Sequence, residues 1–205
     1  PWINTRLVRP GTEPRSWREL LNKEWKGKMG IQDPDLSTSP NAVFYGLTSR
    51  GRLDLAYFKE LGKQDLRFYP TGRMVSEALA RGEVSIILGV GVSSVTPFLQ
   101  EGIPLRAIDM AEGVNVVKAG SGLVLLQGAP QPNSARFFIN WFMSQKGQTT
   151  FHKPQGTVGF RNDMPNFEPH EAQITPANPI WWTLEDDMEA SRITTDKVLK
   201  KLLAS

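Results

Sequence analysis

The chain has 205 residues, and its 24 Lys and Arg against 21 Asp and Glu give a formal net charge of +3 at pH 7. With 40% hydrophobic and 22% charged residues, the composition is that of a folded globular protein, which excludes a disordered or fibrous chain. The absence of cysteine excludes a disulfide framework, a thiolate metal site and a cysteine nucleophile, and the scattered basic residues form no cluster typical of nucleic-acid binders.

The first part of the chain alternates short strands and helices. Residues 16–19 (Ser-Trp-Arg-Glu) form a capping box that begins a short helix, and Ser39 places a hydroxyl cap before Pro40 at the first helical position of another. Apolar spacing predicts amphipathic helices at 53–62 and 72–81. Strands are predicted at 2–8, 28–32 and 66–69.

The clearest buried strand covers residues 84–88 (Val-Ser-Ile-Ile-Leu) and leads into a helix that includes Phe98 and Leu99. A nearly continuous apolar run between helices indicates a strand covered on both faces, so the predicted fold is α/β, a mixed sheet with helices on both faces. The remaining predicted elements are strands at 105–109 and 123–127, a helix from 132, an irregular stretch beyond 148 and a last helix at 194–203.

No set of side chains suited to catalysis can be identified. His152 and His170 lie in the proline-rich last part of the chain without the spacing of a metal site, and no G-x-S-x-G elbow exists. Asp186 and Asp187 are adjacent, so on a helix they would face apart. We therefore expect a protein that is not an enzyme and uses no cofactor or metal ligand set.

A glycine-rich turn follows the buried strand and reads Gly-Val-Gly-Val-Ser-Ser at 89–94. A strand that runs through glycines into a helix leaves backbone N–H groups free at the positive end of the helix dipole, where an anion can bind. The turn lacks the third glycine of a dinucleotide fingerprint, which makes nucleotide binding the weakest interpretation. A small-ligand contact and a tight structural turn both stay open.

A second polar helix start contains Ser37, Thr38, Ser39 and Asn41 around Pro40. One hydroxyl is enough to cap the helix, and the surplus hydroxyls and the amide can bind a polar ligand. Plain capping and ligand contact are equally good interpretations.

Several segments carry a resemblance to a known family. They read Trp-Ile-Asn-Thr-Arg-Leu-Val at 2–8, Ser-Trp-Arg-Glu-Leu-Leu at 16–21, Trp-Lys-Gly-Lys-Met-Gly-Ile-Gln-Asp-Pro at 25–34, Gly-Ala-Pro at 128–130 and Ser-Gln-Lys-Gly-Gln at 144–148. In this order they resemble the type 2 periplasmic solute-binding proteins of ABC importers, in the ferric, thiamine and polyamine branch.

The resemblance implies two α/β lobes that hold a ligand between them and are joined by strands crossing a hinge. Because the likeness begins at a crossing strand, most of the first lobe is expected to be missing. Apolar side chains of the return segment, Phe137, Phe138 and Trp141, would then lack partners and favour self-association. The expected parts are a crossing strand at 1–9, the second lobe at 10–110, a re-crossing strand and return segment at 111–150, and an irregular stretch with a closing helix at 151–205.

The resemblance also implies where a ligand would bind. The hydroxyl-rich segment 37–39 matches a ligand-contacting loop of the family, and 89–94 takes the place of an iron-binding tyrosine pair but contains no tyrosine. Direct iron ligation there is therefore not expected. The predicted ligand contacts are Ser37, Thr38, Ser39, Asn41, Gly91, Val92, Ser93, Ser94, Trp2, Asn4 and Glu112.

The implied function is that of the solute-binding component of an ABC import system, which captures a small anionic or metal-chelate ligand between two lobes. Its partners would be the solute and the transporter permease, its location the periplasm or the cell exterior. The alternative is the ligand-sensing effector domain of a transcription regulator, which shares this architecture. The identity of the solute stays open.

Overall fold

A five-stranded mixed sheet forms the centre of the body in the computed structural model, which describes residues 1–34, 36, 38–116 and 123–181. The strand order is β3-β2-β4-β1-β5. Strands β3, β2 and β4 run parallel, and β1 is antiparallel to both of its neighbours. The predicted α/β fold with a mixed sheet is therefore confirmed. The strands are β1 (Trp2–Asn4), β2 (Met29–Gln32), β3 (Arg67–Tyr69), β4 (Ile86–Leu88) and β5 (Leu105–Ala107).

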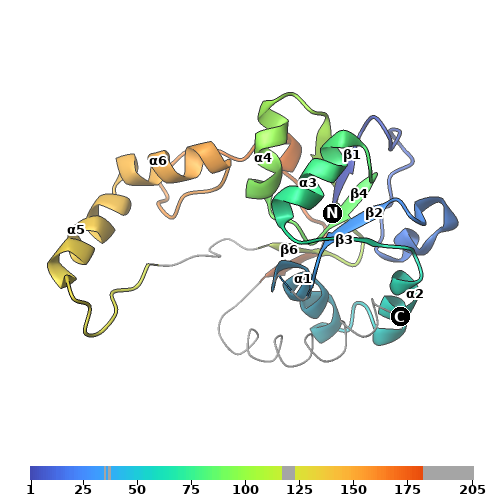
Figure 1. Ribbon diagram of the computed structural model, residues 1–205, viewed down its shortest axis with the longest axis horizontal. Helices are drawn as coiled ribbons and strands as arrows, with labels where there is room; N and C mark the ends of the chain where they lie inside the picture. Colours follow the sequence, from blue (N-terminus) through green and yellow to red (C-terminus); the bar gives the residue numbers. More distant parts are fainter. Residues whose placement is uncertain (35, 37, 117–122, 182–205) are drawn as a thin grey trace.

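Helices cover both faces of this sheet (Figure 1). Successive strand residues point to opposite faces, and β4 shows the consequence for packing. Ile86 packs in a core that contains Phe44 and Phe58, whereas Ile87 packs in a second core that contains Leu79. The first core lies under α1 (Thr38–Ser49) and α2 (Leu55–Gly62), and the second under α3 (Gly72–Arg81) and α4 (Val92–Gln100).

The short helix predicted from the capping box at 16–19 is a 3₁₀ helix, η1 (Arg18–Leu21), and a second one, η2 (Lys23–Trp25), follows it. Trp17, just before η1, is fully buried against Phe44, and its indole Nε1 donates to the carbonyl of Gly113 at 2.8 Å. This segment therefore ties the sheet to the chain that follows β5.

A second, two-stranded sheet joins segments that are far apart in the sequence. Strands β6 (Val114–Val116) and β7 (Pro179–Trp181) pair in parallel; β6 lies within the region 111–150, where a re-crossing strand was expected, and β7 was not predicted. Arg52 links them, because its Nη1 donates to the carbonyl of Glu112 at 2.7 Å and to that of Asn178 at 3.2 Å. The last described part of the chain thus returns to the main body.

Two helices, α5 (Pro132–Phe142) and α6 (Gln145–Gln155), form an arm that projects from the body beside α4 (Figure 1). The strand predicted at 123–127 is wrong, since these residues form no strand and are exposed. The irregular stretch predicted beyond 148 begins later, because α6 continues to Gln155 and ends at Gly156, whose φ is 59°. A 3₁₀ helix, η3 (His170–Ala172), follows, and the helix predicted at 194–203 lies outside the described residues.

Candidate functional site

A cavity of about 480 Å³ opens beyond the carboxyl ends of β4 and β5, at the edge of the sheet where β1 begins. This is the edge at which open α/β sheets place their ligands, and the volume is in the range of small-molecule sites. The lining residues are Pro1, Trp2, Trp17, Ser39, Ala42, Val43, Gly89, Val90, Gly91, Val92, Ala107, Val114, Asn115, Glu168, Ala172, Ile174 and Pro176.

The start of α4 reaches this cavity without a side-chain cap. Its N-cap residue is Gly91, and no side chain accepts from the first-turn N–H groups. The N-caps of α2, α3 and α6 differ, because Asp54, Thr71 and Ser144 each accept from a backbone N–H of the first turn. Since first-turn N–H groups need an acceptor, the α4 start offers them to whatever occupies the cavity.

The start of α1 meets the start of α4 through a close backbone contact. Gly89 has a φ of +68°, and a Cβ at this position would lie 2.7 Å from the Cα of Pro40 in the first turn of α1. Only glycine fits both the left-handed conformation and this approach. The strand-to-helix turn at 89–91 therefore brings two helix starts to one cavity, and Ser39 lines it from the α1 side.

Four of the residues predicted as ligand contacts line the cavity, namely Trp2, Ser39, Gly91 and Val92. The indole Nε1 of Trp2 donates to the carbonyl of Val90 at 3.2 Å, which fixes the ring against the turn before α4. Ser93, Ser94 and Asn41 do not line it; Asn41 is buried and its Nδ2 donates to the carbonyl of Pro34 at 3.0 Å. Thr38 begins α1, and Ser37 lies outside the described residues.

Asn4 and Glu112 do not line the cavity, and the fold uses their polar atoms. The buried amide of Asn4 donates from Nδ2 to the carbonyl of Leu79 at 2.8 Å. Glu112 accepts from Ser16 Oγ at 2.9 Å and from the backbone N–H of Trp17 at 2.8 Å. Both side chains therefore connect segments of the fold that are distant in the sequence.

Glu168 is a polar cavity residue that the sequence did not indicate. It lies in the irregular segment before η3, whose Ala172 also lines the cavity, as does Ile174 just beyond. Among the described residues of the lining, Glu168 carries the single ionisable side chain. No local pattern marks it, because its position depends on the segment folding back across β5.

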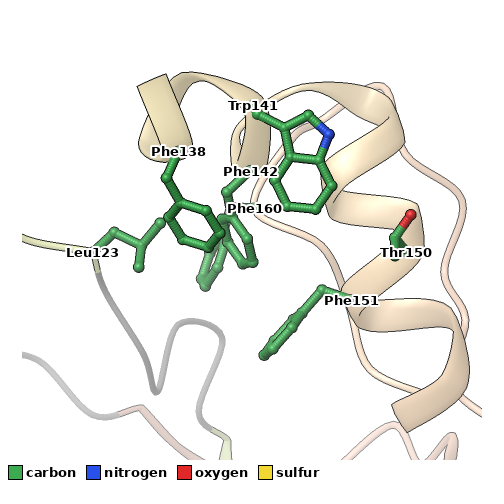
Figure 2. Close-up of a pocket in the computed structure, with 7 residues that line it drawn as sticks. All are labelled: Leu123, Phe138, Trp141, Phe142, Thr150, Phe151 and Phe160. Carbon is green, nitrogen blue, oxygen red and sulfur yellow. The ribbon is translucent and has the colours of Figure 1, made fainter. Parts of the chain in front are cut away.

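The arm holds a second cavity, of about 330 Å³, with an almost wholly apolar lining (Figure 2). Phe138, Phe142 and Phe151 point toward one another in it, between α5 and α6. The outer side of α5 is also apolar, since Phe137 is 77% exposed. The other lining residues are Leu123, Trp141, Thr150 and Phe160.

Over residues 3–180 the sequence matches the family described as bacterial extracellular solute-binding proteins. The chain belongs to this family. The predicted relationship to periplasmic solute-binding proteins is confirmed, and the chain is a periplasmic or extracellular protein. Within the described residues no helix is long and apolar enough to cross a membrane.

Two curated relatives of this solute-binding protein share less than a third of their aligned residues with it. A protein of Haemophilus influenzae is 29% identical over 152 residues, which are 71% of this chain and 43% of the relative. A putative 2-aminoethylphosphonate-binding periplasmic protein of Salmonella typhi is 22% identical over 192 residues, 85% of this chain and 52% of the relative. The chain thus spans about half the length of the curated relatives it matches.

Solved structures share the fold of this solute-binding protein. Iron-bound HitA from Pseudomonas aeruginosa superposes with a TM-score of 0.72 at 16% identity, covering 100% of this chain and 66% of HitA. The periplasmic binding protein AfuA from Actinobacillus pleuropneumoniae, with fructose-6-phosphate bound, gives 0.65 at 21% identity, covering 97% of this chain and 65% of AfuA.

Proposed function

We propose that this chain is part of the solute-binding component of an ABC importer, and that the 480 Å³ cavity captures a small anionic or metal-chelate solute. The observation that carries the proposal is the meeting of two helix starts, at Ser39 and at Gly91–Val92, on one cavity. The component hands its solute to the transporter permease and is not an enzyme.

The chemistry of the cavity favours an anionic group on the solute. The uncapped first turn of α4 provides N–H donors at the positive end of the helix dipole, and Ser39 also lines the cavity. The names of two relatives agree with this class, since one is a putative phosphonate binder and AfuA holds a sugar phosphate. A carboxylate, phosphate or phosphonate is therefore the expected group.

Capture depends on closure by a second lobe. We assign residues 10–110 to the second lobe, 1–9 and 111–150 to the segments that cross to and return toward the first lobe, and 151–205 to the C-terminal stretch. A first lobe that closes over the cavity would add contacts from the other side and shift the open–closed equilibrium. We therefore expect the 205-residue chain to bind solute weakly.

The exposed arm formed by α5 and α6 offers an apolar surface that a first lobe can cover. Apolar surfaces of this kind mark interaction sites, and the solved relatives extend beyond the region they share with this chain. We infer that the first lobe covers the apolar face of α5 in the whole protein. The chain alone would cover it by self-association.

Val92 provides a test of the N–H donors in α4. Val92→Pro removes one backbone donor at the first helical position, where proline is tolerated, and the extended Gly91 before it is compatible with a following proline. Leu55→Pro is the matched control, because Leu55 is the first residue of α2, is exposed and does not line the cavity.

Binding is followed by two-dimensional NMR titration with phosphate, alkyl phosphonates, a sugar phosphate and ferric citrate. We expect shifts confined to residues of the cavity, an affinity reduced about fivefold or more in Val92→Pro, and no change in Leu55→Pro. Binding that Val92→Pro leaves unchanged, or shifts spread over other faces, would contradict the proposal.

A further inference from the structure

The cavity contains one negative side chain, and this limits which anions it suits. Glu168 lines the same cavity as the two helix starts, and no Lys or Arg lies in the described lining. A simple anion bound there would be repelled by the carboxylate, because the apolar walls screen charges less than water does. A solute that also carries a cationic group would be attracted instead.

The backbone of Glu168 is held in place beside the cavity. Its N–H donates to Asn166 Oδ1 at 2.8 Å, and its carbonyl accepts from Gln173 Nε2 at 2.7 Å. A backbone that is already ordered loses less entropy when a ligand binds.

The carboxylate of Glu168 makes little contact with the rest of the protein. Among the described residues, its contact is one long hydrogen bond, from Asn166 Nδ2 to Oε2 at 3.4 Å, and no basic side chain pairs with it. The side chain is half-buried beside the apolar residues Ala172 and Ile174 of the lining. A half-buried carboxylate beside apolar walls is stabilised by a cationic partner.

We propose that the solute is zwitterionic, with an anionic group at the helix starts and a protonated amine bound by Glu168. The inference rests on the proposed function for the anionic end and adds the substrate class. An amine suits the site better than a metal ion, because the described residues hold no group of three metal-binding side chains. The apolar wall formed by Val43, Val90 and Val114 then faces a short alkyl spacer.

The test compares two probes that differ only in the amine, 2-aminoethylphosphonate and ethylphosphonate, at neutral pH. They are titrated into the chain, into Glu168→Gln and into the matched control Glu171→Gln, an exposed glutamate that does not line the cavity. NMR shifts of the indole N–H groups of Trp2 and Trp17 report on the cavity directly.

We expect the unmodified chain and Glu171→Gln to prefer the amino compound by about tenfold. Glu168→Gln should lose this preference while binding ethylphosphonate as well as before or better, since the repulsion is removed. Equal binding of both probes by the unmodified chain, or a preference retained in Glu168→Gln, would overturn the inference and leave the anion site standing. If neither probe binds, the proposed function for the anionic end fails, and the inference falls with it.

Discussion

The imidazole Nδ1 of His152 lies 2.8 Å from the hydroxyl of Thr157, which ties the end of α6 to the segment that follows it. The ring is 5% exposed and packs edge-on against Phe151 and Phe160, at centroid distances of 5.0 and 5.2 Å. Its Nε2 is buried and has no hydrogen-bond partner among the described residues. The neutral form of the ring therefore suits this site.

Stability should fall in mild acid because of His152. Burial lowers its pKa below the usual 6.5, so the unfolded chain binds the proton first as the pH drops. The free energy of unfolding therefore decreases as the pH falls below about 6.5. The decrease is at most about 1.4 kcal/mol per pH unit and ends once the pH is below the pKa of the folded state. Urea unfolding at about pH 7 and about pH 5.5 measures the loss.

Two variants separate His152 from the other titrating groups. His152→Gln should flatten the pH dependence between these two conditions, whereas His170→Gln, at an exposed position on η3, should leave it as it is. Identical slopes for the unmodified chain and His152→Gln would show that this ring does not carry the effect.

Gly89 should be intolerant of any side chain. Gly89→Ala forces an alanine to a φ of +68° and places its Cβ against the backbone of Pro40, and the two penalties together are worth about 3 kcal/mol. Gly91→Ala is the control, since its φ is −76° and a Cβ would meet nothing within 4 Å. Thermal unfolding compares them, and equal melting temperatures would refute the close approach of α1 and α4.

Glu112 should matter for stability and not for solute binding. Glu112→Ala leaves Ser16 Oγ and the Trp17 N–H without their acceptor, which costs about 2 kcal/mol, whereas Glu24→Ala, at an exposed position, should cost little. Urea unfolding measures the difference. A variant that folds stably but loses affinity for the solute would instead support Glu112 as a ligand contact.

The apolar face of α5 should drive association of the isolated chain. Sedimentation velocity over a series of protein concentrations is expected to show oligomers, and the double variant Phe138→Ser, Trp141→Ser should shift the chain to monomer, because both side chains are exposed and apolar. Leu7→Ser with Met74→Ser removes two exposed apolar side chains outside the arm and should change nothing. Oligomers of equal size in both double variants would rule out the arm as the interface.

The main sheet could be predicted from the sequence because its strands carry their own signal. The run Ile86–Leu88 is apolar throughout and is buried on both faces, and Gly72–Arg81 forms the predicted helix with Gly82 ending it. Strands β6 and β7 carry no such signal, since each has three residues and exists only through pairing with a distant segment. The strand predicted at 123–127 is wrong for the opposite reason. The apolar run at 123–126 has a strand-like sequence, but an apolar run forms a buried strand only where it can pair with a sheet, and Val124 is 76% exposed.

The residues of the candidate site likewise differ in whether the sequence could predict them. Gly91 and Val92 could be found because glycines between a buried strand and a helix are a local pattern, and this pattern predicts a free helix start. Asn4 and Glu112 are predicted ligand contacts, yet their hydrogen bonds show that a polar side chain on a crossing segment can equally serve the fold. Glu168 gave no signal, since only the tertiary fold brings its segment to the cavity.

The place of β1 between β4 and β5 has a consequence for how the protein reaches its native state. Both partners follow β1 by roughly 80–100 residues, so β1 cannot pair within the sheet until a long stretch of polypeptide is present. Early intermediates would expose the edges of Trp2–Asn4 without a neighbour on either side. For a polypeptide that works outside the cytoplasm, we expect such slow pairing to leave time for export before the sheet is complete.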